Sequence, residues 1–162
     1  MQKTTKWISK KRFFVITGII VAALTVVGGK VYMDKEAEKK EMQELALKDD
    51  KAIAQKIKDN FSGVEEITFH STSKLPSEPG GYKSVLSVKY SWSDSLSESA
   101  RSNNRSVNYE SLGKAKEMND DFLVSDIVGF VDEKSSDIYM KHFGQTETSI
   151  KVIYPNGEEE QI

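Results

Sequence analysis

The residues of this chain whose types and spacing could do chemistry are a serine–lysine pair, two histidines and several acidic clusters. Ser71 and Lys74 are three positions apart, the spacing with which some serine enzymes let a lysine amine take the serine proton. Ser102-Asn103-Asn104 matches an accompanying serine–x–asparagine element, but the Lys-Thr-Gly element of those enzymes is missing. We therefore expect no catalytic residues and no enzyme activity.

The histidines and acidic clusters do not form a metal-binding pattern. His70 and His142 have no second histidine or cysteine at ligand spacing. Asp120-Asp121 and Glu158 to Glu160 lack the alternating oxygen ligands and central glycine of a calcium loop. No glycine-rich phosphate loop is present either. We expect no metal site and no cofactor.

An uncharged segment near the start of the chain indicates a membrane. The 17 residues from Phe13 to Gly29 contain no charge, and as a helix they would span about 25 Å. Continuation to Met33 makes up the remaining thickness, because Lys30 can extend its ammonium group to the lipid headgroups. We predict a single transmembrane helix over residues 13–33, embedded in the lipid bilayer.

The charges before this segment predict its orientation. Residues 1–12 include five Lys or Arg and no acid, a bias that keeps such a leader in the cytoplasm. The chain is then a single-pass protein of the cell membrane, with the rest of it outside. A signal peptide cleaved after Gly29 remains an alternative. A lipoprotein is excluded, because the chain has no cysteine to carry the lipid.

The remainder of the chain is acidic. The first 33 residues hold six of the 23 Lys and Arg residues and none of the 25 Asp and Glu residues. The remainder therefore carries 17 basic against 25 acidic side chains, a net charge of −8. Nucleic acid is disfavoured as a partner, because its phosphates require clustered cations. A protein with a basic or mixed-charge surface is favoured.

A long helix is predicted directly after the membrane segment. Residues 34–60 contain no Gly or Pro and are rich in Ala, Leu, Lys, Glu and Gln. Residues 34–41 have no apolar face and are predicted to be a solvated stalk. From 42 onward an apolar stripe follows helical spacing, interrupted at Asp49 and Asp50. A coiled-coil seam is possible, but packing on the domain's own sheet is favoured.

The segments after this helix predict an α+β domain over residues 42–162. Ser62-Gly63 ends the helix, residues 64–71 and 82–92 alternate as strands, and 107–112 forms a short strand. The period of 122–131 does not decide between helix and strand, and 134–143 is predicted to be a helix capped at Ser135 or Ser136. Residues 148–154 and 158–162 form a terminal hairpin. The predicted fold is a long amphipathic helix on a small antiparallel sheet of about four strands.

Two segments carry a resemblance to a known group of proteins. Asp-Asn-Phe-Ser-Gly-Val-Glu-Glu-Ile-Thr-Phe at 59–69 and Ile-Lys-Val-Ile-Tyr-Pro-Asn-Gly-Glu-Glu-Glu at 150–160 follow a single span and a charged helix. In this order the chain resembles small, membrane-anchored, uncharacterised exported proteins of Gram-positive bacteria, which form a multi-copy family. The resemblance implies an exported α+β domain behind one span and supplies no catalytic residues. Such multiplicity suits immunity proteins that neutralise toxins.

Two functions follow as hypotheses. In the first, the exported domain is a non-enzymatic protein-binding module, of a toxin-neutralising kind, that contacts its partner through the aromatic face of one strand. Its candidate binding residues are Tyr82, Tyr90 and Trp92. Tyr90 and Leu86 are favoured as core, and Trp92 is expected to be the most exposed. In the alternative, the chain is a structural or assembly subunit that acts through its transmembrane helix.

Overall fold

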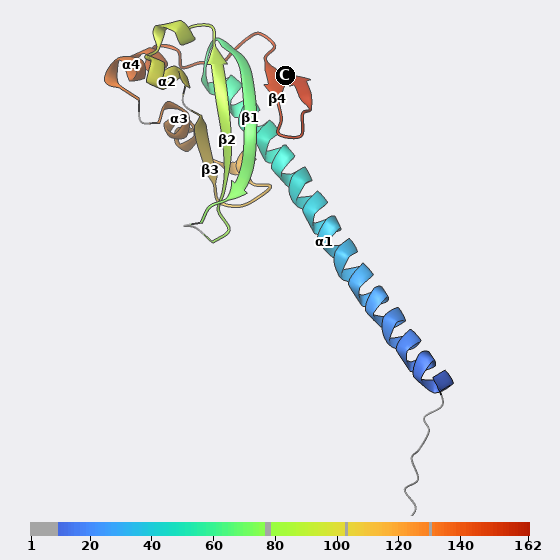
Figure 1. Cartoon of the computed structure of the whole chain (residues 1–162). Coiled ribbons are helices and arrows are strands. Elements are labelled where there is room, and N and C mark those ends of the chain that lie inside the picture. Colours follow the sequence, from blue (N-terminus) through green and yellow to red (C-terminus); the bar gives the residue numbers. More distant parts are fainter. Residues whose placement is uncertain (1–9, 77–78, 103, 130) are drawn as a thin grey trace, which may run out of the picture. The chain divides into compact units, whose positions relative to one another are not determined.

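The computed structural model describes residues 10–76, 79–102, 104–129 and 131–162, with the backbone alone for residues 10–34 and 102. The chain divides into two compact units, residues 1–41 and 42–162. Its described elements, labelled in Figure 1, are α1 (Lys10–Asn60), β1 (Val64–Lys74), β2 (Tyr82–Tyr90), η1 (Ser93–Ser95), α2 (Glu98–Ser102), β3 (Arg105–Tyr109), η2 (Ala115–Glu117), α3 (Asp120–Val128), α4 (Glu133–Lys141), β4 (Lys151–Ile153) and β5 (Glu159–Gln161).

The membrane prediction concerns residues whose side chains the structure does not describe. Where side chains are described, no helix has both the length and the apolar character needed to cross a bilayer. The span predicted over 13–33 lies outside those residues and stays a prediction.

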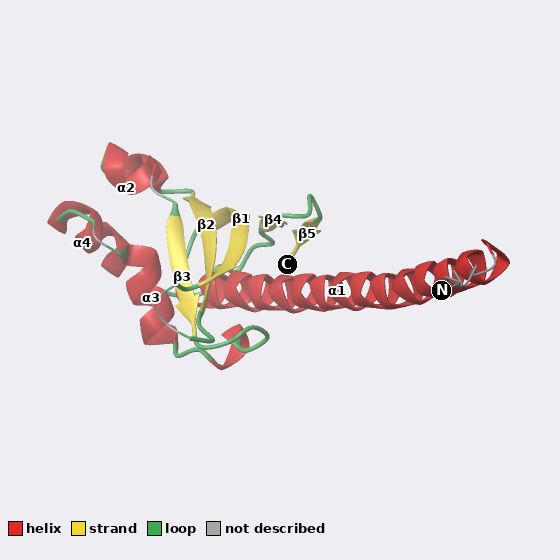
Figure 2. Cartoon of the chain, turned by 60° about the horizontal axis from the view of Figure 1, so that its bottom comes forward, coloured by secondary structure: helices red, strands yellow, loops and turns green. Residues whose placement is uncertain are grey.

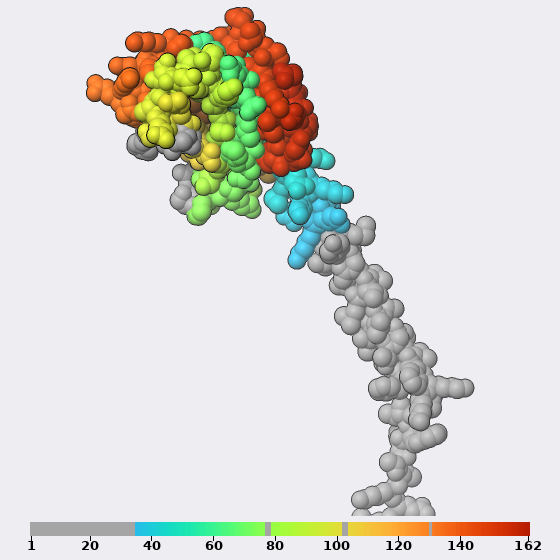
Figure 3. Space-filling model, turned by 45° about the horizontal axis from the view of Figure 1, so that its top comes forward, coloured from blue at the N-terminus to red at the C-terminus, as the bar shows by residue number. Residues whose placement is uncertain are grey.

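The five strands form one mixed sheet in the order β3-β2-β1-β4-β5. All neighbours are antiparallel except β1 and β4, which pair in parallel with Glu66 opposite Lys151. The α+β class is confirmed, but the prediction of about four strands, all antiparallel, is wrong. The reason is the long connection through α3 and α4. It starts from β3, at one edge of the sheet, and returns the chain on the other side of β1, so that β4 runs in the same direction as β1. Figure 3 shows the β4–β5 hairpin (red) beside β1 (green).

The C-terminal part of α1 packs on one face of the sheet, as Figure 2 shows. Ile53, Ala54 and Ile57 are fully buried in one core cluster with Ile67 of β1 and Leu86 of β2. Packing of the apolar stripe on the domain's own sheet is therefore confirmed. The opposite face of β2 carries half-buried and exposed side chains, so the core lies between helix and sheet.

The transition from α1 to β1 occurs at the predicted residues. The helix ends at Asn60, and Gly63 adopts a positive φ of 71°. A Cβ atom at position 63 would lie 2.5 Å from the hydroxyl oxygen of Ser91, so both the backbone conformation and the close approach of this side chain favour glycine.

The segment between β3 and β4 contains the three helical elements η2, α3 and α4. Residues 122–131, for which the sequence left the period open, lie mostly in α3. The start of α4 corrects a prediction, because its N-cap is Asp132 rather than Ser135 or Ser136. The Asp132 carboxylate accepts the backbone N–H of Ser135 at 2.9 Å and the hydroxyl of Ser97 at 2.5 Å. The Asp132 carboxylate is negatively charged, and it is therefore a better acceptor at a helix N-terminus than a neutral serine hydroxyl. Through Ser97 it also links the η1–α2 turn to α4.

Candidate functional site

An open groove lies between β3, the segment that follows it, and α3. Its volume is about 680 Å³, which is in the range of pockets that bind ligands or partner side chains. Asn108, Glu110 and Ser111 line it from the end of β3 onward. Met118, directly after η2, and Phe122 of α3 also line it. Figure 1 shows α3 beside β3, the strand at one edge of the sheet.

Phe122 provides a large exposed apolar surface at this groove. The side chain of Asn119 caps α3 by accepting the N–H of Asp121 at 2.8 Å, which sets the start of the helix. Leu123 and Ile127 are fully buried one turn apart. Since successive helical residues are rotated by about 100°, the neighbouring Phe122 turns away from the core and is 67% exposed.

Acidic groups dominate the charge of the groove. Glu110, Glu117 and Asp126 line it together with one cation, Lys114, which forms an ion pair with Glu117 at 2.5 Å. The Asp126 carboxylate accepts the backbone N–H of Asn108 at 2.8 Å and so covers part of the free edge of β3. Burial raises the pKa of Asp126, and that hydrogen bond partly offsets the increase.

The helix α1 carries two buried carboxylates, Asp49 and Asp50. Asp50 is 1% exposed, and it accepts the hydroxyl of Ser84 on β2 at 2.6 Å and that of Thr72 on β1 at 3.1 Å. The pKa of Asp50 is raised to about 6. Burial is the largest cause, the two hydroxyl donors partly offset it, and the neighbouring charge of Asp49 adds to it. The oxygen atoms of Asp50 are thus engaged by the sheet.

Asp49 faces the segment that forms the groove wall. Its carboxylate accepts the backbone N–H of Gly113 at 2.6 Å and that of Ala115 at 3.0 Å. Burial raises the pKa of Asp49, and these two N–H groups lower it. Gly113 has a φ of 86°, and a Cβ atom there would lie 3.2 Å from the side chain of Leu45 on α1. The β3–η2 connection therefore packs directly on α1: Asp49 accepts its N–H groups, and the absence of a side chain at Gly113 leaves room for Leu45.

The predicted aromatic binding residues are distributed differently from expectation. Tyr90 is 3% exposed and Trp92 is 9% exposed, and both belong to the core cluster. The indole N–H of Trp92 donates to the carbonyl of Ser62 at 2.8 Å, and its ring stacks on His142 at 4.5 Å. The prediction that Trp92 is exposed is therefore wrong, because α4 covers it, while the core position of Tyr90 and Leu86 is confirmed. Tyr82 is half-buried and stacks on Tyr109.

The residues considered for catalysis or metal binding lie on separate parts of the domain. Ser71 and Lys74 are exposed in the second half of β1. His70 is exposed beside Ser87, whereas His142 stacks on Trp92 at the end of α4. Over the described ranges, no three His, Asp or Glu side chains gather in an arrangement that could hold a metal ion.

Asp49 and Asp50 are the residues of this region that sequence reasoning missed. They were visible only as an interruption of the apolar stripe. Two acidic residues at apolar-stripe positions of a helix predict buried carboxylates, and such carboxylates need hydrogen-bond donors from the element that packs on the helix. Phe122 stands in the apolar run 122–131, whose sequence gives no sign that this side chain is exposed.

Comparison with known proteins gives no further assignment. No protein-family model matches the chain, and neither a curated protein nor a solved structure matches it.

Proposed function

We propose that this chain is a membrane-anchored, extracellular, non-enzymatic binding module that holds a protein partner in the groove beside Phe122. The observation that carries the proposal is the 67% exposure of Phe122 at the edge of a groove of about 680 Å³. Phenylalanine and methionine, the two apolar residues of this groove, are both enriched in protein–protein interfaces relative to the rest of the surface.

The charge of the groove specifies the partner's chemistry. Three carboxylates against one lysine line it, and residues 34–162 carry a net charge of −8. The partner segment that fits presents an apolar side chain to Phe122 and Met118, flanked by Lys or Arg toward Glu110 and Asp126. A secreted toxin with a basic surface is the partner that the immunity-like form of this proposal requires.

The proposal is tested by purification from native cells of the full-length protein and two variants. Phe122→Glu introduces a charge at the groove, and Met140→Glu introduces the same charge at the exposed Met140 of α4, 62% exposed. We expect a stoichiometric protein partner with wild type and Met140→Glu, and its loss with Phe122→Glu. Absence of any stoichiometric partner, or equal loss in both variants, contradicts the proposal.

A replacement of the anchor separates this function from the assembly alternative. Residues 13–33 are exchanged for a poly-leucine helix of equal length. We expect the partner to be retained, since the groove lies within residues 108–126. Loss of the partner with the exchanged helix favours an assembly subunit that acts through its membrane segment.

A further inference from the structure

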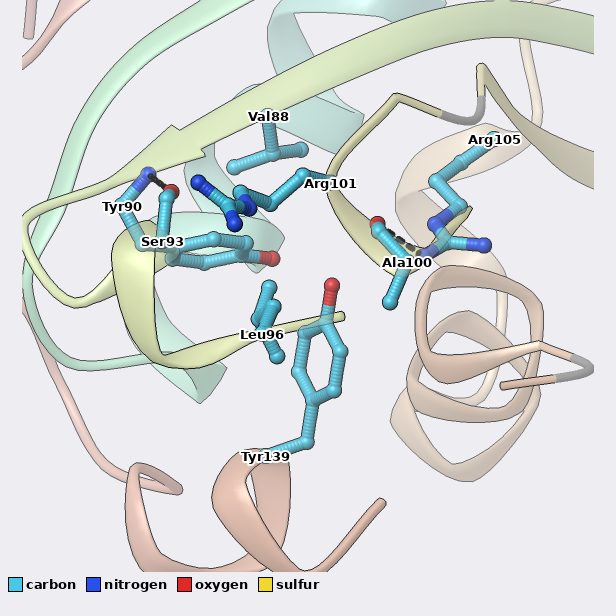
Figure 4. Close-up of a pocket in the computed structure, with 8 residues that line it drawn as sticks. All are labelled: Val88, Tyr90, Ser93, Leu96, Ala100, Arg101, Arg105 and Tyr139. Carbon is cyan, nitrogen blue, oxygen red and sulfur yellow. Dashed lines mark hydrogen bonds between the residues drawn. The ribbon is translucent and has the colours of Figure 1, made fainter. Parts of the chain in front are cut away.

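The small cavity beneath β2 has no room for a ligand. Figure 4 shows Tyr90 of β2 and Tyr139 of α4 on its walls. Its volume is about 10 Å³, which is the lower limit for a single water molecule. A chemically reactive sequence lies elsewhere, in the turn that joins β4 to β5 at the edge of the sheet opposite to β3.

This turn contains an asparagine followed by a glycine. Asparagine is one of the thermolabile residues of proteins, because the backbone nitrogen of the next residue can attack its side-chain carbonyl carbon. A side chain on that next residue hinders the attack, and Gly157 has none. Asn156, Gly157 and Glu158 are exposed, and a Cβ atom at position 157 would meet nothing within 4 Å. The surroundings of Asn156 therefore leave the attack by Gly157 sterically open.

In the closed turn, hydrogen bonds hold both reacting groups. The N–H of Gly157 donates to the carbonyl of Tyr154 at 2.9 Å, and Oδ1 of Asn156 accepts the N–H of Glu158 at 2.9 Å. The Gly157 nitrogen must lose its proton before it can attack, and a hydrogen bond made by the protonated form opposes that loss. The attack therefore requires a local opening of the turn.

Lys51 of α1 holds the hairpin closed. Its Nζ lies 3.3 Å from a carboxylate oxygen of Glu158 and 3.0 Å from one of Glu160. The same Nζ lies 5.4 Å from the centre of the Tyr154 ring, within the range of a cation–π contact. Three side chains of the hairpin thus depend on one lysine, and its removal favours the open turn.

We infer that Asn156 is a site of spontaneous deamidation whose rate is set by opening of the β4–β5 turn. In the open turn, hydroxide removes the proton of the Gly157 nitrogen, and this nitrogen forms a bond to Cγ of Asn156. The bond from Cγ to Nδ2 then breaks, and Nδ2 takes a proton from water and leaves as ammonia. A second water molecule opens the resulting cyclic imide at either of its carbonyl carbons, which gives aspartate or isoaspartate.

The product weakens the hairpin. It places a new carboxylate beside Glu158, which it repels. Isoaspartate also adds a methylene group to the backbone of the turn, and the longer backbone does not fit the 2.9 Å hydrogen bond from the N–H of Tyr154 to the carbonyl of Glu158. The modification therefore loosens the edge of the sheet at β5 and leaves the groove beside β3, at the other edge, unchanged.

Peptide mapping by mass spectrometry tests the inference on the full-length protein in detergent, incubated at pH 8. We expect conversion of Asn156 to aspartate and isoaspartate, at a rate that increases with pH. Lys51→Gln removes two exposed ion pairs and should accelerate the conversion at least about twofold. Lys89→Gln removes the exposed ion pair with Glu65, 2.9 Å long, on β2 and β1. It is the matched control and should keep the wild-type rate.

Incubation of the wild type in guanidinium chloride at the same pH gives the rate without the turn. We expect this rate to exceed that of folded Lys51→Gln, which in turn exceeds that of folded wild type. Three results would each overturn the inference. They are an intact Asn156 in the unfolded chain, equal rates in the folded and unfolded wild type, and equal rates in Lys51→Gln and Lys89→Gln.

Discussion

The carboxylate of Asp50 on α1 accepts a 2.6 Å hydrogen bond from the hydroxyl of Ser84 on β2. Ser84 in turn lies 3.4 Å from the hydroxyl of Tyr109, the last residue of β3. This chain of polar contacts joins the helix to three strands across an otherwise apolar interface, since Thr72 of β1 also donates to Asp50. The long helix and the edge of the sheet that carries the groove are thereby coupled.

The first prediction concerns the pH dependence of stability. Because the pKa of Asp50 is raised from 3.8 to about 6 in the folded state, protonation favours folding, and this contribution is lost as pH rises from 4 to 7. Asp50→Asn has no charge to bury. Its free energy of unfolding relative to wild type should therefore rise by up to about 3 kcal/mol across that range. Asp49, whose pKa is also raised, remains in both proteins.

Urea unfolding of wild type and Asp50→Asn at pH 4.5 and pH 7.5 measures this difference. The comparison within each pH removes the contributions of other groups, including Asp132, whose pKa is lowered to about 2. A difference between the two proteins that does not change with pH would refute the assignment.

The second prediction concerns the brace between α1 and the groove wall. Asp49→Ala leaves the N–H groups of Gly113 and Ala115 without their acceptor, which should lower the free energy of unfolding by about 1–3 kcal/mol. Amide exchange at these two residues should accelerate more than exchange in β1. Asp59→Ala, at an exposed position of the same helix, is the control and should change neither. Unaltered exchange at Gly113 in the Asp49 variant argues against the brace.

The third prediction distinguishes a core role of Trp92 from a binding role. Trp92→Ala removes the hydrogen bond to Ser62 and the stacking on His142, and it should destabilise the domain by about 3–5 kcal/mol. At a temperature where this variant remains folded, partner binding should equal that of wild type. Near-normal stability combined with lost binding would instead make Trp92 a contact residue.

Local features of the fold could be predicted from the sequence, whereas non-local ones could not. The end of α1, the strands and the C-terminal hairpin follow from Gly63, from alternation in β2 and from Pro155-Asn156-Gly157. The parallel pairing of β4 with β1 depends on a long connection whose path has no local signature. The position of Trp92 at the end of a strand predicts exposure. Its burial depends on His142, which is fifty residues away in sequence and therefore leaves no local signal.

The candidate site shows the same division. In the sequence, Asp49 and Asp50 appear only as an interruption of the apolar stripe of α1. Their burial is possible because Ser84, Thr72 and Gly113, on other elements, donate hydrogen bonds to their carboxylates. Phe122 belongs to an apolar run, and only the orientation of α3, with Leu123 and Ile127 inward, exposes it.

The central claim, that a protein partner occupies the groove beside Phe122, is tested most directly by photo-crosslinking in intact cells. A photoreactive phenylalanine analogue replaces Phe122 in one protein and Met140, a similarly exposed residue of α4, in another. We predict one discrete crosslinked species from position 122 and none from position 140. No crosslinked protein from position 122, or the same species from both positions, would contradict the account.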